Sequence, residues 1–116
     1  MDNRELFDEV AGTYKREVIK FEPRNGPKRH ELKTWPKPFS AVLGGNKTHE
    51  VRVNDRDFRE GDELYLREYD PDTGRYTGRH ILATISYITP GGTFGLPENL
   101  CVMSLRIQWW DVSAAA

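Results

Sequence analysis

The chain has 116 residues, of which 37% are hydrophobic and 30% are charged, and its formal net charge is −1. A chain of this length can bury one hydrophobic core, and the composition is that of a folded domain, which argues against disordered and fibrous proteins. No segment resembles a signal peptide or a membrane span, so we expect a cytoplasmic protein without a membrane partner.

The first 29 residues are predicted to form a helix and a linker. Apolar side chains recur at three- and four-residue steps over residues 3–18, which is typical of an amphipathic helix. Residues 22–29 contain two prolines and a glycine and predict the linker. The helix either packs on its own domain or binds a protein partner.

A strand, a helix and a second strand are predicted next. His30–Thr34 is expected to be extended, and Pro36 suits the first turn of a helix that ends at Gly44-Gly45. Alternation over Thr48–Val53 separates the two valines from the charged residues. We expect the valine face to enter the core, so that Glu50 and Arg52 point outward together.

Three further strand regions follow, joined mostly by tight turns. Residues 63–69 predict a strand, and the Asp-Pro-Asp-Thr-Gly sequence at 70–74 predicts a turn into a hairpin partner that starts near Tyr76. The β-branched segment Ile81–Thr89 predicts a long strand. The last strand is expected over residues 100–110, with at least one of Trp109 and Trp110 in the core.

This order of elements favours a mostly β domain with helices, of the α+β class. We predict a mostly antiparallel barrel, closed or half-closed, of about five to six strands, with a helix plugging one side. The predicted divisions are residues 1–29 for the helix and linker, 30–110 for the barrel and 111–116 for a tail. Cys101 lies in an apolar run, so we expect a buried, reduced thiol.

The positive charge of the chain is concentrated in one segment. Residues 24–56 contain eight Lys or Arg against three Asp or Glu, a local charge of +5. A basic region on a nearly neutral protein indicates an anionic ligand held at one site. The alternative is an ordinary solvated surface.

Lys47, Glu50 and Arg52 are the candidate site residues in this segment. A lysine and a carboxylate held close together can share a proton in acid–base or nucleophilic chemistry, and Arg52 offers a planar fork for phosphate. His30 and Lys33 could enter the same cleft. The same charges could instead form a surface ladder of ion pairs, each typically contributing less than about 1 kcal/mol.

Several other kinds of site are not supported by the sequence. One cysteine and three separated histidines do not form a zinc motif, so no metal is expected. The glycine-rich loops of dinucleotide and nucleoside-triphosphate folds are absent, as is the nucleophile elbow of α/β-hydrolases, and we expect no cofactor.

Several segments resemble the ASCH superfamily, and the greatest similarity is to phage and bacterial ASCH-like domains of uncharacterised function. The similar segments, in order, are H-E-L-K at 30–33, P-F-S-A-V-L-G-G-N-K at 38–47, E-V-R-V-N-D-R at 50–56, F-R-E-G-D at 58–62 and L-Y-L-R-E-Y at 64–69. The resemblance covers about residues 30–108. It implies a PUA-like barrel with a cleft beside the helix that follows the first strand, in a bacterium or a phage-infected cell.

The resemblance also implies a function. Members of the family bind RNA, and some are described as ribonucleases or as amidohydrolases of acetylated cytidine. Lys47 matches the cleft lysine of the family and Arg52 matches the arginine that closes the motif. The amidohydrolases have a threonine nucleophile three residues after the lysine, whereas this chain has Glu50 there, which departs from their chemistry.

The first hypothesis is therefore a module that binds RNA or a nucleotide-like ligand in a basic cleft. Its expected binding residues are Lys33, Trp35, Lys47, Arg52, Asn54, Arg56 and Tyr69. The alternative is an enzyme, a ribonuclease or nucleoside amidohydrolase, with Lys47, Glu50, Arg52 and His30 as catalytic candidates. A third hypothesis is a phage-type protein-interaction module that uses the N-terminal helix.

Overall fold

The structure, a computed structural model, describes residues 24–113. The helix that the sequence predicts over residues 3–18 lies outside this range. The described elements, in chain order, are β1 (Arg29–Thr34), α2 (Pro36–Leu43), β2 (His49–Val53), β3 (Glu63–Asp70), β4 (Arg75–Thr89) and β5 (Leu100–Asp111).

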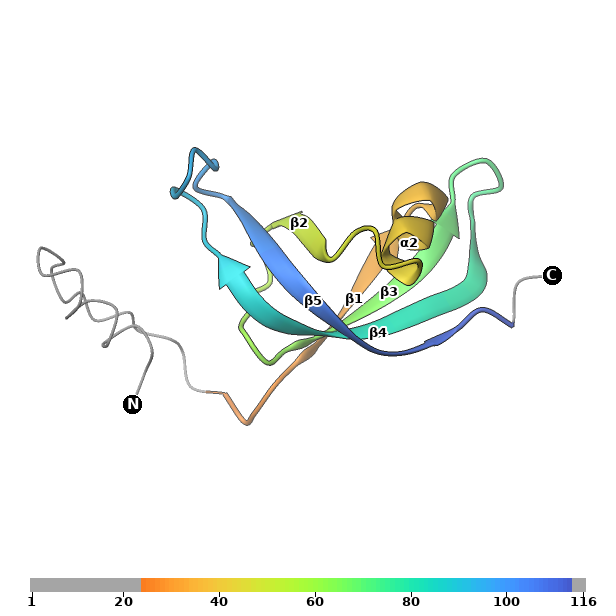
Figure 1. Cartoon of the computed structure of the whole chain (residues 1–116), viewed down its shortest axis with the longest axis horizontal. Helices are drawn as coiled ribbons and strands as arrows, with labels where there is room; N and C mark the ends of the chain where they lie inside the picture. Colours follow the sequence, from red (N-terminus) through yellow and green to blue (C-terminus); the bar gives the residue numbers. More distant parts are fainter. Residues whose placement is uncertain (1–23, 114–116) are drawn as a thin grey trace, which may run out of the picture.

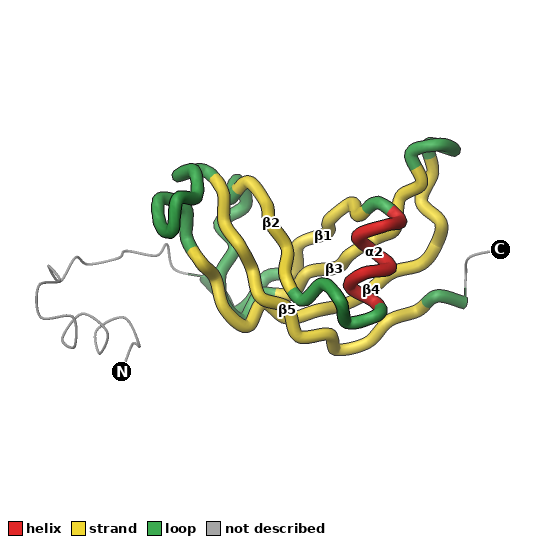
Figure 2. Tube along the Cα trace, turned by 45° about the horizontal axis from the view of Figure 1, so that its top comes forward, coloured by secondary structure: helices red, strands yellow, loops and turns green. Residues whose placement is uncertain are grey.

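The five strands form one curled sheet, a half-barrel, in the order β1-β3-β4-β5-β2 (Figure 1). The pair β1–β3 is parallel and the other three pairs are antiparallel. The helix α2 lies on the concave side of the sheet (Figure 2). The prediction of a mostly antiparallel β fold with a helix after the first strand is confirmed, and β1 and β2 are its two edge strands.

The core lies between the concave face of the sheet and α2. In β3, the side chains of Leu64 and Leu66 alternate inward and are fully buried, as the sequence predicts. The helix contributes Phe39 and Val42, which have exposures of 0% and 1%. The other core residues come from the sheet and from the loop before β3: Leu32, Phe58, Ile81, Ile85, Cys101 and Met103.

Cys101 is buried and unpaired, as the sequence predicts. Burial raises the pKa of its thiol because a thiolate is poorly solvated in the core. We therefore expect a thiol reagent at neutral pH to leave the native protein unmodified. The measurement is mass spectrometry of the alkylated protein, with the denatured protein as the control that reacts fully. Rapid native labelling would contradict the buried position.

The prediction for the two faces of β2 is wrong. The side chains of β2 alternate as predicted, but the face with Glu50 points inward and the face with the valines points outward. Glu50 is 4% exposed, whereas Val51 and Val53 are 46% and 48% exposed. The core is already filled by α2 and the other strands, so the inner face of β2 meets polar groups instead. Burial of Glu50 is tolerated because Lys47 and Arg52 pair with it.

Two further predictions are corrected at the long strands. Neither Trp109 nor Trp110 is a core residue, since they are 44% and 56% exposed. The segments near Tyr76 and at Ile81–Thr89 form one continuous strand, which passes through Gly78 at a φ of 92°. A glycine permits this backbone conformation, so the chain does not have to break there. Within residues 24–113, no helix is long and apolar enough to cross a membrane.

Candidate functional site

A cleft of about 390 Å³ lies where the edge strands β1 and β2 meet the start of α2. The segments that precede and follow α2 in the sequence therefore both contribute to the cleft. The residues that line it are Lys33, Thr34, Trp35, Pro38, Lys47, Glu50, Val51 and Arg52.

The junction between β1 and α2 forms one wall of the cleft. Trp35 has an extended backbone (φ −70°, ψ 159°), and Pro36 begins the helix directly after it. The residue before a proline is disfavoured in the helical conformation, so the sequence itself fixes this sharp change from strand to helix. The side chain of Trp35 is left 57% exposed at the cleft.

The turn after α2 places Lys47. Gly45 has a φ of 80°, a left-handed conformation that favours glycine at a helix end. The backbone N–H of Lys47 donates to the carbonyl of Ala41 at 2.9 Å, which ties the turn to the helix. The Nζ of Lys47 then donates to the carbonyl of His49 and to Oε1 of Glu50, the latter at 3.0 Å.

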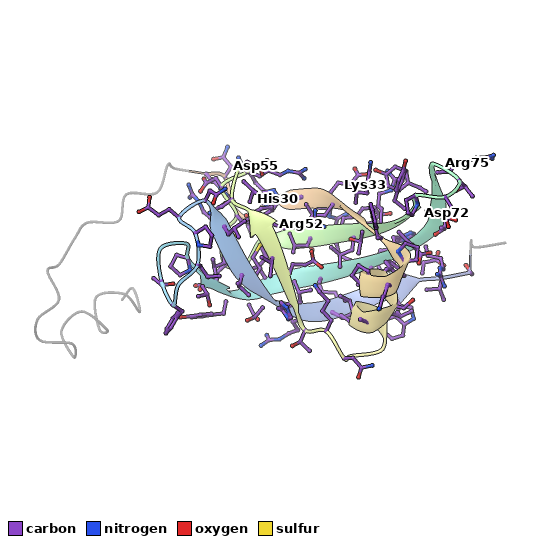
Figure 3. All side chains as sticks on the ribbon, turned by 90° about the horizontal axis from the view of Figure 1, so that it is seen from above. His30, Lys33, Arg52, Asp55, Asp72 and Arg75 are labelled. Carbon is purple, nitrogen blue, oxygen red and sulfur yellow. The ribbon has the colours of Figure 1, made fainter. Side chains whose placement is uncertain are left out.

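Glu50 lies between two cations. Its Oε1 accepts from Lys47, and its Oε2 accepts from the Nε of Arg52 at 3.1 Å. Arg52 also donates from Nη2 to the carbonyl of Lys33 at 2.9 Å, so that its side chain spans from β2 to the other edge strand. Figure 3 shows the labelled Arg52 beside β1. Glu50 therefore holds both cations at the cleft.

Thr34 is a cleft residue that the sequence analysis missed. Its side chain points inward from the end of β1, it is 3% exposed, and its Oγ1 has no hydrogen-bond partner within the described chain. A buried hydroxyl without a partner typically costs about 1–3 kcal/mol, so it calls for an explanation. The available signal was its position: it shares the inward face of the predicted strand with His30 and directly precedes Trp35-Pro36.

Lys33 and Tyr69 are predicted binding residues whose side chains lie on the other side of the sheet. The carbonyl of Lys33 is at the cleft, but its Nζ lies 4.1 Å from the centre of the Tyr69 ring. Side chains alternate along a strand, so Lys33 points away from the concave face into which Leu32 and Thr34 point. The cations inside the cleft are therefore Lys47 and Arg52.

His30 does not line the cleft, contrary to the prediction that it could serve there as a base. It is buried, its Nε2 lies 2.8 Å from Oδ2 of Asp62, and its ring packs edge-on against Phe58. Asp62, which follows Gly61 in the turn before β3, also accepts from Nη1 of Arg24 at 2.7 and 2.8 Å. The Gly-Asp motif therefore belongs to a buried structural cluster.

The pKa of Asp62 is lowered in this cluster. Burial alone would raise the pKa of the carboxyl, but the hydrogen bonds from Arg24, from His30 and from the backbone N–H groups of Lys28 and Arg59 outweigh it. The carboxylate of Asp62 thus joins the segment before β1 to the loop before β3.

Asn54 and Arg56 are predicted binding residues that do not line the cleft. The side-chain oxygen of Asn54 accepts from the backbone N–H of Phe58 at 3.1 Å. Arg56 donates from Nη1 to the carbonyl of Glu31 at 2.6 Å. Arg52 and Arg56 therefore hold two alternate carbonyls of the same edge strand, and only Arg52 belongs to the cleft.

The structure brings together Trp35, Lys47, Glu50 and Arg52, which the sequence grouped as one site. Their role in binding or catalysis stays a prediction. Among residues 24–113, no three His, Cys, Asp or Glu side chains are grouped so that they could hold a metal ion. The chemistry available in the cleft is that of two cations, one carboxylate, one hydroxyl and one indole ring.

Comparison with known proteins gives the family but no activity. The chain is 42% identical over 62 residues to a protein of Escherichia phage P2, described as an uncharacterised 12.9 kDa protein in the GpA 3′ region. The match covers 53% of this chain and 55% of the phage protein, so it spans about half the length of that relative. Residues 29–105, which include the whole cleft, match the model of a domain of unknown function, DUF3850. The chain belongs to the DUF3850 family.

Proposed function

We propose that this domain is an ASCH-type module with a PUA-like half-barrel that binds RNA, or a nucleotide derived from it, in the cleft between β1, α2 and β2. The curled five-stranded sheet, with a helix directly after its first strand, is consistent with that fold. The cleft lies where the resemblance implies one.

The size and chemistry of the cleft suit a single nucleotide. A volume of about 390 Å³ lies near the lower end of the range of ligand pockets, which start at about 300 Å³. Lys47 and Arg52 are suited to a phosphate group, and the exposed ring of Trp35 is suited to stacking on a base. These groups recognise different parts of one nucleotide.

The observation that carries the proposal is the unpaired hydroxyl of Thr34. Thr34 lines the same cleft as the two cations and the exposed indole ring, and its hydroxyl is buried behind that surface. A buried polar group without a partner calls for an explanation, and a role in ligand binding is one that fits a residue at a cleft. A nucleotide provides hydrogen-bonding groups on its base and its ribose, and either could pair with this hydroxyl.

Replacing Thr34 by valine is expected to change stability and binding in opposite directions. Valine has nearly the same shape as threonine and lacks the hydroxyl. The free energy of unfolding of the variant should therefore be about 1 kcal/mol higher than that of the wild type. Nucleotide affinity should fall about tenfold, because one hydrogen bond to the ligand is lost. Denaturant unfolding and titration calorimetry with ribonucleoside monophosphates measure the two effects.

The matched control is Thr34→Ser, which retains the hydroxyl and removes only a methyl group. It should keep most of the affinity for the nucleotide. The proposal for the cleft fails if neither the wild type nor the serine variant binds any ribonucleotide or short RNA. It also fails if valine leaves the affinity of a bound nucleotide unchanged.

The enzyme hypothesis is the second candidate, and the contact between Lys47 and Glu50 at 3.0 Å favours it. In that reaction Lys47 would stabilise developing negative charge and Glu50 would accept a proton. However, both oxygens of Glu50 already accept hydrogen bonds from cations. This arrangement, with one cation on each oxygen, fits a positioning role for Glu50 better.

Product analysis separates the two hypotheses. Cellular RNA and a panel of modified nucleosides, acetylated cytidine included, are incubated with the wild type and with Glu50→Gln, and the products are analysed by mass spectrometry. We expect intact substrates from both. Turnover by the wild type that is lost in Glu50→Gln while binding persists would establish the enzyme instead.

A further inference from the structure

The convex face of the sheet, opposite the cleft, presents a second group of aromatic and basic side chains. Residues that point away from the core on β1, β3, β4 and β5 lie in register with one another. The rings on this face that contact one another, which we call the outer platform, are those of Tyr65, Tyr69, Tyr76, His80 and Trp109.

The rings contact one another across the strands. His80 lies between Tyr65 and Trp109, with ring centres 5.1 and 5.2 Å away. Tyr69 and Tyr76 form a second pair at 5.3 Å. The five rings therefore form two groups, one of three rings and one of two, on three adjacent strands.

Cations lie over these rings. The Nζ of Lys33 is 4.1 Å from the centre of the Tyr69 ring, and the Cζ of Arg67 is 3.8 Å from that of Tyr76. Such stacking holds a cation beside an aromatic face. The outer platform thus presents positive charge and flat rings side by side.

Two of the rings also cover part of the sheet. Leu82 points toward the outer platform, lies in register with Tyr65 and Trp109, and is only 3% exposed. Much of the ring surface is not used to cover Leu82, because Trp109 is 44% exposed and Tyr76 is 40% exposed to solvent. The surplus of exposed ring is what suggests a ligand.

We propose that the outer platform binds single-stranded nucleic acid by stacking of its bases. Aromatic rings interleaved with basic side chains are the usual means by which sheets bind unpaired bases without regard to sequence. A protein partner fits less well, because the centre of a protein–protein interface is depleted in charged residues. The inference relies on the proposed function for the class of ligand, but on different residues.

The balance of charge on this face favours an anionic strand. Glu31 and Glu63, on β1 and β3, are each paired with an arginine, and Asp111, in register with His80 on β5, accepts hydrogen bonds from Ser113. Lys33 and Arg106 have no carboxylate partner among residues 24–113. They remain available to phosphate groups, as a backbone that follows the rings requires.

Lys33 connects the two sites. Its carbonyl lies at the cleft, where it accepts from Arg52, and its ammonium group lies on the outer platform over Tyr69. A strand with one nucleotide in the cleft can therefore continue across β1 onto the aromatic rings. In this arrangement the cleft selects one nucleotide and the platform adds affinity for a longer chain.

The test compares two probes with the full chain. The first is uridine monophosphate, which fits the cleft alone, and the second is a fluorescein-labelled oligouridylate of about ten nucleotides. Trp109→Leu and Tyr65→Leu remove a ring while an apolar side chain still covers Leu82. Each should weaken oligonucleotide binding about 5- to 100-fold and leave the affinity for the monophosphate unchanged.

The matched control is Tyr87→Leu, which removes a ring that is 59% exposed on β4 and is not one of the five platform rings. It should bind both probes as the wild type does. Ultraviolet cross-linking of the oligonucleotide to the wild type gives a second measurement that needs no variant. Peptide mass spectrometry should find the cross-links at Tyr65, His80 or Trp109.

The outcomes for the two sites can be told apart. If the oligonucleotide binds no tighter than the monophosphate, or cross-links only at Trp35, the platform proposal is overturned and the cleft proposal stands. If the monophosphate does not bind but the oligonucleotide cross-links at the platform, the cleft proposal falls and the platform stands. The platform proposal is also overturned if Tyr87→Leu loses as much oligonucleotide affinity as Trp109→Leu does.

Discussion

Replacing Asp62 by asparagine is expected to lower the free energy of unfolding by about 3–5 kcal/mol. Asp62 is 1% exposed and pairs with Arg24, whose side chain is 7% exposed, so the variant leaves a nearly buried guanidinium without its carboxylate. The hydrogen bond that the carboxylate accepts from Nε2 of His30 is also altered. Urea denaturation followed by tryptophan fluorescence measures the change.

Asp57→Asn is the matched control for this prediction. Asp57 also pairs with Arg24, at 3.4 Å, but its own side chain is 53% exposed. An exposed ion pair typically contributes less than about 1 kcal/mol, so this variant should unfold nearly as the wild type does. Equal losses in the two variants would show that burial of Asp62 is not what makes its pairing important.

The same cluster should make the folded protein less stable in acid. The pKa of Asp62 is lower in the folded chain than in the unfolded chain, because its hydrogen-bond donors outweigh the effect of burial. Its stabilising contribution is therefore present above the ordinary carboxyl pKa and is lost as the pH falls through the folded value. Asp62→Asn should accordingly lose less stability than the wild type between neutral and strongly acidic pH.

The strand and helix positions could be predicted because local rules agree with the fold. Pro36 and Gly45 bound α2, and the alternation of Leu64 and Leu66 in β3 sets the face that meets the core. Periodicity, proline position and glycine conformation act over a few residues, so they are visible in the sequence.

The orientation of β2 could not be predicted in the same way. Its alternation is clear, but two orientations are compatible with it, and hydrophobicity alone favours the wrong one. The observed orientation depends on ion pairs that Glu50 makes with Lys47 and Arg52, and on a core already filled by other elements. This is a tertiary effect that outweighs the preference of the valines for burial.

The candidate site could be predicted only in part, because the place of some of its residues depends on the tertiary fold. Lys47, Glu50 and Arg52 are close in sequence, and alternation puts Glu50 and Arg52 on one face of β2 whichever way that face points. His30 and Lys33 lie on the same strand as the cleft residue Thr34, but His30 is at the other end of the inward face, in the Asp62 cluster, and alternation turns Lys33 onto the outer platform. The unpaired hydroxyl of Thr34 is visible only once its surroundings are known.

Arg52 is the residue whose loss should weaken nucleotide binding most. Arg52→Ala removes the guanidinium that lines the cleft and leaves Glu50 with one of its two cations. Truncating one partner of a hydrogen-bonded charge pair at a binding site typically costs about 2–5 kcal/mol, which corresponds to about a 30- to 5,000-fold weaker affinity. Titration calorimetry with a ribonucleoside monophosphate measures this. The affinity of Arg52→Lys should lie between those of the wild type and Arg52→Ala, because lysine keeps the positive charge but lacks the planar fork.

Arg56→Ala separates recognition from support of the fold. Arg52 and Arg56 both donate to carbonyls of β1, those of Lys33 and Glu31, so both variants loosen the contact between the same segments. Only Arg52 lines the cleft. If the cleft binds a phosphate, Arg56→Ala should keep its affinity, and the salt dependence of binding should become shallower in Arg52→Ala alone. Equal losses of affinity and stability in the two variants would mean that these arginines only hold the edge of the half-barrel, and that the anion binds elsewhere.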